Sequence, residues 1–215
     1  MRSSPPATLN RRKAPRQARS AVTVDAIFEG TIQVLLTCGP IRLNTTRVAQ
    51  RAGVSVGTLY QYFPNKQALL FAVLERHLAM LANALEVACG DHRGATAEVM
   101  AEAVVKAYLQ AKTRRCEVSR ALYLIAIELD AGGLIEAATR RGEQTIAAML
   151  STTSDGHFPE PHLVAQTLLA AVNGTVRTFY ERNLPPAMGG EVESQLTIMC
   201  RSYLAAASRA ERRPA

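Results

Sequence analysis

The sequence predicts an all-α protein of about nine helices in two parts. Apolar residues recur three and four positions apart along most of the 215 residues, as on one face of a helix. Alternating apolar runs bounded by turn residues, which would indicate β-strands, do not occur. Residues 45–66 read as two short helices around a tight turn, and the rest of the chain is organised around them.

Residues 1–20 form a basic arm that is predicted to be disordered. The arm carries six Lys or Arg residues and no acid, and three prolines interrupt it. It could serve as a solubilising tail, or it could attract DNA phosphates, including by insertion into a minor groove. We favour phosphate attraction.

The first helix is expected over residues 23–38, where Gly39 and Pro40 end it. Its inward stripe is Ile27, Thr31, Val34 and Leu35. Ile41 and Leu43 are expected to hold the following loop in place.

Two short helices then flank a glycine turn. The first starts at Asn44 or Thr45, both good N-cap residues. Gly53 supplies the positive φ of a sharp reversal, and Ser55 caps the second helix. The inward positions are Val48, Ala49 and Ala52 in the first helix and Leu59 and Phe63 around the second.

The outer face of the second short helix differs from an ordinary solvated face. It is nearly uncharged and rich in hydroxyl groups, where Lys and Glu would be usual. Short side chains let a helix lie deep in the major groove, and tyrosine hydroxyls can reach phosphates beside it. The face is expected to consist of Val56, Gly57, Thr58, Tyr60, Gln61 and Tyr62. Lys66 and the first amides of the next helix also favour a phosphate.

The run AQRAGVSVGTLYQYFPNKQALL, residues 49–70, resembles the TetR family of bacterial transcriptional regulators. The resemblance extends over about residues 23–74, and Pro40 departs from it where an aromatic residue is usual. It implies a helix-turn-helix DNA-binding domain at 21–67, after the arm at 1–20, and a helical ligand-binding and dimerisation domain at 68–210. The DNA-binding residues that it implies are Thr45, Thr46, Arg47, Ser55, Val56, Gly57, Thr58, Tyr60, Gln61, Tyr62 and Lys66. Gln61 is the best candidate for reading a base, since an amide can bond bidentately to adenine.

The longest helix is expected over residues 65–89, with leucines at spacings of four, four, three and four. A helical pattern then covers residues 95–129 without Gly or Pro to divide it. The sequence allows one long helix there, whereas the family architecture implies a break near 114–117. Three further helices are expected over 134–150, 163–183 and 191–208.

The helix over 163–183 is apolar on two sides, so it needs two packing partners. By resemblance, the last two helices form a homodimer interface, with Ala165, Leu169, Val176, Leu196, Met199 and Tyr203 as candidates. The alternative is that both helices complete a monomeric core. A dimer would bind a roughly palindromic operator in double-stranded DNA.

The resemblance also implies an apolar cavity in the C-terminal part for an unknown small-molecule effector. The candidate lining is Leu81, Val104, Tyr108, Tyr123, Ile127, Asn173, Arg177 and Tyr180. Asn173 and Arg177 are four apart, so both lie on one edge of a helix and could orient a polar or anionic ligand end. The alternative is that Tyr108 and Tyr123 are ordinary core residues and that Arg177 is a solvated or interface residue.

Charge and composition restrict the other possibilities. Residues 1–66 hold ten Lys or Arg and two acids, a net +8, and residues 67–215 hold fifteen and sixteen, a net −1. This asymmetry favours a polyanion at one end of the chain and not a membrane, and no apolar run looks long enough to span a bilayer. The four cysteines read as buried hydrophobes in a reducing cytoplasm, without metal-ligand spacing.

Three functions are compatible with a basic, all-α chain. The first is a sequence-specific transcriptional regulator, most simply a repressor that a ligand releases from its operator, in the bacterial cytoplasm and at the nucleoid when bound. The second is an enzyme, for which no nucleophile–base pair, carboxylate pair, metal set or cofactor site is found. The third is an architectural DNA-binding protein without a ligand. The sequence favours the first function. It does not distinguish a repressor from an activator.

Overall fold

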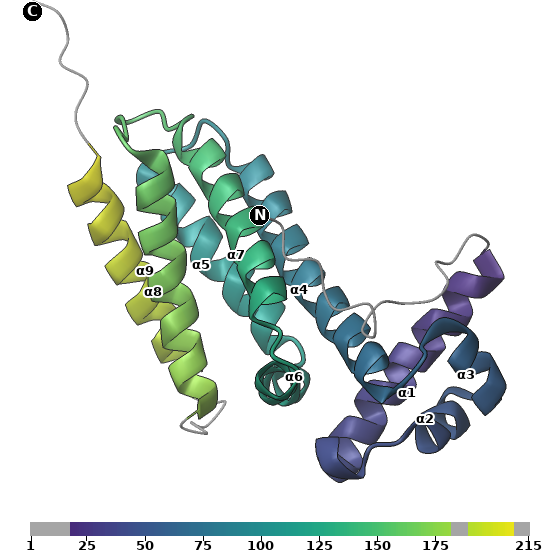
Figure 1. Ribbon diagram of the computed structural model, residues 1–215. Helices are drawn as coiled ribbons and strands as arrows, with labels where there is room; N and C mark the ends of the chain where they lie inside the picture. The colour runs from purple at the N-terminus through teal and green to yellow at the C-terminus, as the bar shows by residue number, and fades with distance from the viewer. Residues whose placement is uncertain (1–17, 182–188, 209–215) are drawn as a thin grey trace, which may run out of the picture. The chain divides into compact units, whose positions relative to one another are not determined.

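The computed structural model describes residues 18–181 and 189–208, and this part of the chain forms nine α-helices (Figure 1). The all-α prediction is therefore confirmed. The helices are α1 Ala18–Arg42, α2 Thr45–Ala52, α3 Val56–Tyr62, α4 Lys66–Asp91, α5 Ala97–Thr113, α6 Cys116–Glu128, α7 Gly132–Leu150, α8 Pro161–Glu181 and α9 Gly189–Ala207. Most of the basic arm lies outside the described residues.

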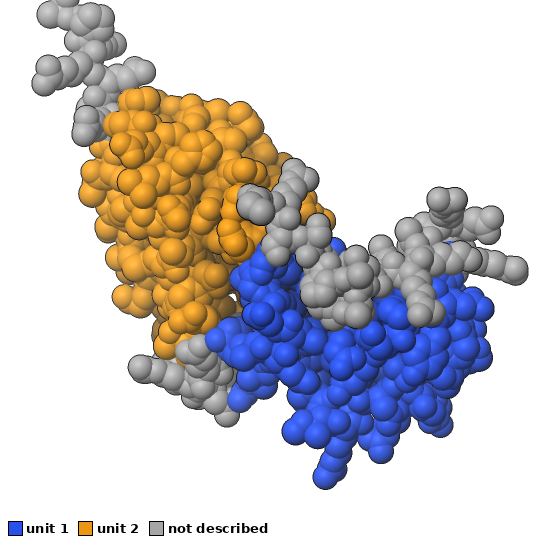
Figure 2. All heavy atoms as spheres, viewed as in Figure 1, with its two compact units in different colours: residues 1–78, 115–135 blue, residues 79–114, 136–215 orange. Residues whose placement is uncertain are grey.

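The chain divides into two compact units (Figure 2). Unit 1 comprises Met1–Leu78 and Arg115–Ile135, and unit 2 comprises Ala79–Arg114 and Glu136–Ala215. The helix α4 therefore contributes to both units, and α6 packs with the N-terminal helices of unit 1.

Unit 1 has one apolar core. The rings of Phe28 on α1 and Phe63 after α3 meet with centroids 5.6 Å apart, and Val118 and Leu122 of α6 join the same cluster. The expected α1 stripe of Ile27, Thr31, Val34 and Leu35 is buried, as predicted. Thr31 is tolerated there because its hydroxyl donates to the carbonyl of Ile27 at 2.7 Å.

The helices of unit 2 run alongside one another around a second core (Figure 1). Its fully buried side chains include Met100, Val104, Ile146, Met149, Leu150 and Val172. Gly142 of α7 permits a close approach, since a Cβ there would stand 3.1 Å from Leu169 Cδ2 and 3.2 Å from Leu85 Cδ1.

The end of α1 differs in part from the prediction. Gly39 has φ 73° and ψ 172°, so the regular helix ends where expected, but a further turn continues to Arg42. The amide of Leu43 donates to the carbonyl of Gly39 at 3.2 Å, and this turn points Leu43 inward and leaves Ile41 92% exposed. The expectation that Ile41 anchors the loop is wrong.

The predicted break in the 95–129 pattern is confirmed. Arg114 and Arg115 separate α5 from α6, and Arg115 leaves helical geometry with φ −137° and ψ 70°. In α9 the buried residues are Leu196, Cys200 and Leu204, whereas Met199 is 42% exposed.

Two helices, Ser20–Arg42 and Lys66–Asp91, are long and apolar enough to cross a membrane by length and composition alone, contrary to the expectation from the sequence. The protein buries 39% of the apolar window in the first helix and 56% in the second. Ile27 and Leu70, for example, belong to the core of unit 1. Packing in a globular core accounts for their composition.

Candidate nucleic-acid interface

Local hydrogen bonds fix the helix-turn-helix in the way that the sequence predicts. Asn44 caps α2 by accepting the amide of Arg47 at 2.9 Å, and Ser55 caps α3 by accepting the amide of Thr58 at 2.9 Å. Gly53 adopts the left-handed conformation at φ 68° and ψ 28°, and its amide bonds back to the end of α2. The turn between the helices is therefore set by Gly and by two side-chain caps.

The face of α3 that was expected to meet DNA is open to solvent at three of its six positions. Leu59 and Phe63 are fully buried, as predicted, and they fix the rotation of the helix. Gly57, Tyr60 and Gln61 are exposed, whereas Val56 and Thr58 are half-buried. Tyr60 keeps 41% of its surface exposed.

Thr45 and Tyr60 join the two short helices. The Thr45 Oγ1 and Tyr60 hydroxyl atoms lie 3.0 Å apart and share a hydrogen bond, and Thr45 is only 9% exposed. Thr45 therefore holds Tyr60 in position from the buried side of α2. Thr46 and Arg47 are exposed beside it.

The expectation that Tyr62 lies on the outer face is wrong. Tyr62 is 8% exposed, its ring lies 6.3 Å from that of Phe63, and its hydroxyl shares a 2.9 Å hydrogen bond with Ser20 of α1. The physical reason is helical periodicity, because Tyr62 follows Leu59 by three positions and so shares its face. That spacing was available in the sequence.

Lys66 begins α4, and its ammonium donates to the carbonyl of Pro40 at 2.7 Å. Asn65 caps this helix by accepting the amide of Ala68 at 2.8 Å. An ammonium has three donors, so the bond to Pro40 places Lys66 without exhausting its capacity for a phosphate.

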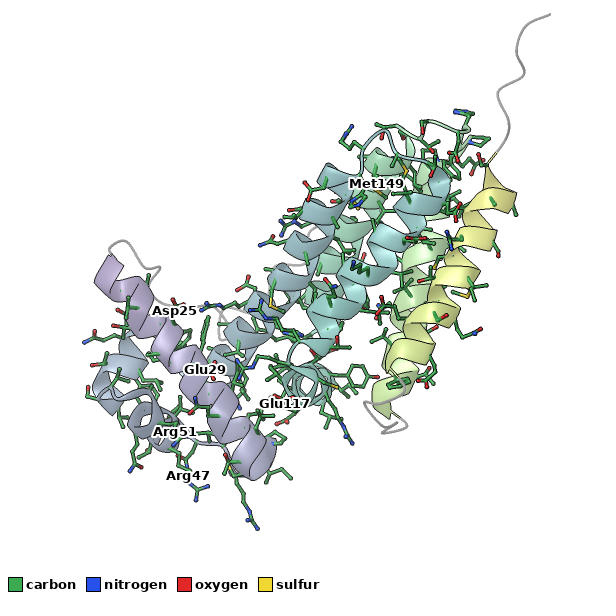
Figure 3. The ribbon with its side chains drawn as sticks, turned by 180° about the vertical axis from the view of Figure 1, so that it is seen from behind. Asp25, Glu29, Arg47, Arg51, Glu117 and Met149 are labelled. Carbon is green, nitrogen blue, oxygen red and sulfur yellow. The ribbon has the colours of Figure 1, made fainter. Side chains whose placement is uncertain are left out.

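The sequence reasoning missed Arg51. Arg47 and Arg51 both extend from α2 (Figure 3), and Arg51 Nε donates to Gln33 Oε1 of α1 at 2.5 Å. The spacing of four positions between two arginines on an exposed helix face was the available signal.

The expected ligand residues fall into separate groups. In unit 2, Leu81, Val104 and Tyr108 are buried, and the Tyr108 hydroxyl donates to Asn173 Oδ1 at 2.9 Å. Arg177 of the same unit is exposed. Tyr123 and Ile127 belong to α6 in unit 1, where Tyr123 is half-buried and Ile127 is 66% exposed. The side chain of Tyr180 lies outside the described residues.

The sequence reasoning did not include Lys112 of α5, which lies beside Tyr108. Its ammonium lies 5.9 Å from the centre of the Tyr108 ring. Burial lowers the pKa of Lys112 to about 8, because desolvation disfavours the charged form.

Most of the expected dimer residues are core residues of a single chain. Ala165, Leu169, Val176 and Leu196 are buried within one chain, so their assignment to an exposed interface is wrong. The two apolar sides of α8 are both covered inside unit 2, with α5 and α9 as neighbours. Met199 remains 42% exposed and Tyr203 half-buried. Further exposed apolar side chains on these helices are Leu163 and Ile198.

The cysteines follow the expectation in part. Cys89 and Cys200 are buried, and burial raises the pKa of Cys89 to about 12 and that of Cys200 to about 11. Cys38 and Cys116 are half-buried, contrary to the expectation. Among the described residues, no cluster of His, Cys, Asp and Glu could hold a metal ion.

Comparison with known proteins gives two family matches. The model described as bacterial regulatory proteins of the tetR family matches residues 27–73. The model described as the tetracyclin repressor-like C-terminal domain matches residues 96–204, just over half of the chain.

One curated relative is an uncharacterized HTH-type transcriptional regulator, YvkB of Bacillus subtilis (strain 168). It is 34% identical over 65 residues, which are 30% of this chain and 34% of that protein. The chain therefore aligns with about a third of this relative's length.

Solved structures match over much more of the chain. The fatty acid degradation regulator FadR from Bacillus halodurans is 15% identical with a TM-score of 0.65, over 94% of this chain and 100% of that one. FadR from Bacillus subtilis in complex with stearoyl-CoA is 16% identical with a TM-score of 0.65, over 83% of this chain and 98% of that one. At these identities the likeness shows the fold.

Proposed function

The chain belongs to the tetR family of bacterial regulatory proteins, and we propose that it is a sequence-specific DNA-binding repressor that a small-molecule ligand releases from its operator. It would act as a homodimer on a roughly palindromic operator, in the cytoplasm at the nucleoid. Thr46, Arg47, Gly57, Thr58, Tyr60, Gln61 and Lys66 would supply the principal DNA contacts.

The outer face of α3 is the observation that carries this proposal. Its exposed positions, Gly57, Tyr60 and Gln61, are uncharged, and the buried Leu59 and Phe63 hold that face outward. A small residue allows a close approach to base edges, and an amide reads adenine. The net +8 of residues 1–66 supplies the non-specific attraction that brings the face to DNA.

Polar groups within unit 2 support the proposal that a ligand releases the protein from its operator. Tyr108, Asn173 and Lys112 place a hydroxyl, an amide and an amine among apolar helices. A few polar groups among apolar side chains are typical of a ligand site. The FadR of Bacillus subtilis binds stearoyl-CoA, so an effector with a long apolar part is a reasonable first class to test here.

The experiment begins with selection of duplexes from a random DNA library by the wild-type protein. A repressor retains its selected duplex over random DNA as salt rises from about 50 to about 200 mM, whereas an architectural protein loses both together. Thr58→Ala should weaken binding to the selected duplex by about 1–3 kcal/mol. Thr178→Ala, at an exposed position of α8, is the matched control. Failure to select any sequence would contradict the proposed function.

A further inference from the structure

A groove of about 690 Å³ opens between α1 and α2 in unit 1. Its polar lining comes from Gln33 and Thr37 on α1 and from Arg47, Gln50 and Arg51 on α2. The described lining thus contains two guanidinium groups, two amides and a hydroxyl, and no carboxylate. The Thr37 hydroxyl donates to the carbonyl of Gln33 at 2.7 Å, so the donors that face a ligand come mainly from Arg47, Arg51 and Gln50. Two guanidinium groups in a lining without a carboxylate favour an anion, and a phosphate in particular.

Hydrogen bonds hold both arginines at the groove. Arg51 Nε donates to Gln33 Oε1 at 2.5 Å, and Gln33 Nε2 donates to Glu29 Oε1 at 3.2 Å. Arg47 Nη1 donates to the carbonyl of Arg42 at 3.2 Å. A guanidinium has five N–H donors, so each bond orients its arginine and leaves most of the fork for a ligand. Less conformational entropy is then lost when the ligand binds.

The position of α2 indicates the source of the phosphate. In a helix-turn-helix the second helix enters the major groove and the first crosses the sugar-phosphate backbone. Here α2 is that first helix, and it packs against both α3 and α1. The groove lies on its α1 side, so it would meet backbone at the edge of the sequence that α3 reads.

We propose that this groove binds one backbone phosphate of DNA flanking each half-site, with Arg51 and Arg47 as the charged ligands and Gln33 as the residue that positions Arg51. The proposal rests on the proposed DNA-binding function and extends the interface to α1, which supplied none of the DNA-binding residues that the sequence predicted. A free phosphate ion has the same chemistry, so the experiment must separate the two sources.

The first measurement is the salt dependence of binding to the selected duplex, with the full-length protein. Each phosphate contact contributes about 0.9 to the slope of log K against log salt. Arg51→Gln should therefore weaken the salt dependence, making the slope less negative by about 1.8 for a dimer with one contact per protomer. Arg93→Gln makes the same charge change at an exposed position in unit 2 and should leave the slope unchanged. Arg51→Lys should keep most of the slope, since it keeps the charge.

The second measurement locates the phosphate. Single phosphates flanking each half-site are replaced by uncharged methylphosphonates. Replacement at one position per half-site should weaken DNA binding by the wild-type protein. The same replacement should have no further effect on DNA binding by Arg51→Gln. The same position should still weaken binding of Arg93→Gln. Purely additive losses at every position would overturn the proposal.

The third measurement tests the small-ion source. Inorganic phosphate is titrated against the wild-type protein and Arg51→Gln at matched ionic strength. Phosphate binding that needs Arg51, combined with an unchanged DNA slope in Arg51→Gln, would overturn the proposal in favour of a small anion. If Thr58→Ala weakens DNA binding while Arg51→Gln does not, only the groove assignment fails. If the wild-type protein selects no DNA, the proposed function fails with it.

Discussion

Glu29 of α1 accepts hydrogen bonds from both terminal nitrogens of Arg115, the residue that precedes α6, at 2.8 and 3.1 Å. Gln33 also donates to Glu29, so a hydrogen-bonded chain runs from Arg51 on α2 through α1 to the start of α6. All four residues belong to unit 1. This chain connects the DNA-binding helices to α6, which lies far from them in the sequence.

The first prediction concerns the pH dependence of this pair. The hydrogen bonds from Arg115 hold the pKa of the Glu29 carboxyl below its usual 4.5, with Gln33 assisting. A depressed carboxyl pKa contributes stability above the unfolded pKa, and that stability is lost as pH falls through the folded pKa. We therefore expect Glu29→Gln to be less stable than wild type at neutral pH and to lose less stability below about pH 4.5.

Both partners of this pair are nearly half exposed, so solvent screens the interaction and the difference should stay below about 1 kcal/mol. Urea unfolding at neutral and acidic pH measures it. Glu136→Gln, which breaks an exposed ion pair with Arg140 on α7, is the matched control. Equal acid sensitivity of Glu29→Gln and wild type would count against the assigned role of Arg115.

The second prediction separates the two tyrosines of α3. Tyr62→Phe loses the hydrogen bond with Ser20 and should destabilise the protein by about 0.5–1.5 kcal/mol. Its affinity for the selected duplex, measured on folded protein, should be unchanged because the ring is buried. Tyr60→Phe should weaken DNA binding, since Tyr60 is 41% exposed on the outer face of α3 and Thr45 holds its hydroxyl in position. The reverse pattern would restore the outward assignment of Tyr62.

The third prediction concerns the turn. Gly53 has φ 68°, a left-handed conformation that costs a residue with a Cβ about 1–2 kcal/mol. We expect Gly53→Ala to lower the free energy of unfolding by about this amount, and Gly53→Asn to lower it less, because Asn visits this region more readily. A Cβ at Gly53 would meet no atom within 4 Å, so the loss would come from the backbone alone. Thermal unfolding of both variants measures the difference, and equal losses would contradict this account.

The local features of the interface could be predicted from the sequence. Asn44, Gly53 and Ser55 act through bonds to residues three or four positions away, and these bonds depend on little else. The burial of Leu59 and Phe63 follows from helical spacing, and the same rule applied to Tyr62 would have placed it inward.

The remaining features depend on which helices become neighbours. The bond between Arg51 and Gln33 joins two helices, so spacing along one helix does not reveal it. In α8, the two apolar sides predicted two packing partners, and by resemblance residues of this helix were assigned to the dimer interface. The structure buries both Leu168 and Leu169 inside one chain, because α5 and α9 of the same unit pack against this helix. Burial in a single-chain core and burial at an interface leave the same apolar signature.

The fourth prediction concerns Lys112. Its pKa is lowered by burial from 10.5 to about 8, so the charged amine destabilises the folded protein. This penalty is fully present below about pH 8 and disappears as pH rises toward 10.5. We expect Lys112→Met to be more stable than wild type near pH 7, by about 1–3 kcal/mol. The difference should shrink between about pH 8 and 10.5 in urea unfolding, and a constant difference would contradict the burial of the amine.

The last prediction concerns assembly and follows from the corrected α9 face. Because Val176 and Leu196 are buried within one chain, a charge at either position should unfold unit 2 and would not test a dimer. Ile198 and Met199 are 54% and 42% exposed on α9, and a second copy could cover both of these apolar side chains.

Ile198→Glu combined with Met199→Glu should therefore convert a dimer to a monomer while circular dichroism and unfolding midpoint stay close to wild type. Binding to a palindromic duplex should then fall steeply, because two half-sites are no longer bound together. Val87→Glu, at a 64% exposed position of α4, introduces a charge on the same unit and should leave assembly unchanged. Sedimentation equilibrium measures the mass. A double variant that remains dimeric would place the interface elsewhere, and a wild-type monomer that binds a single half-site tightly would refute the dimer.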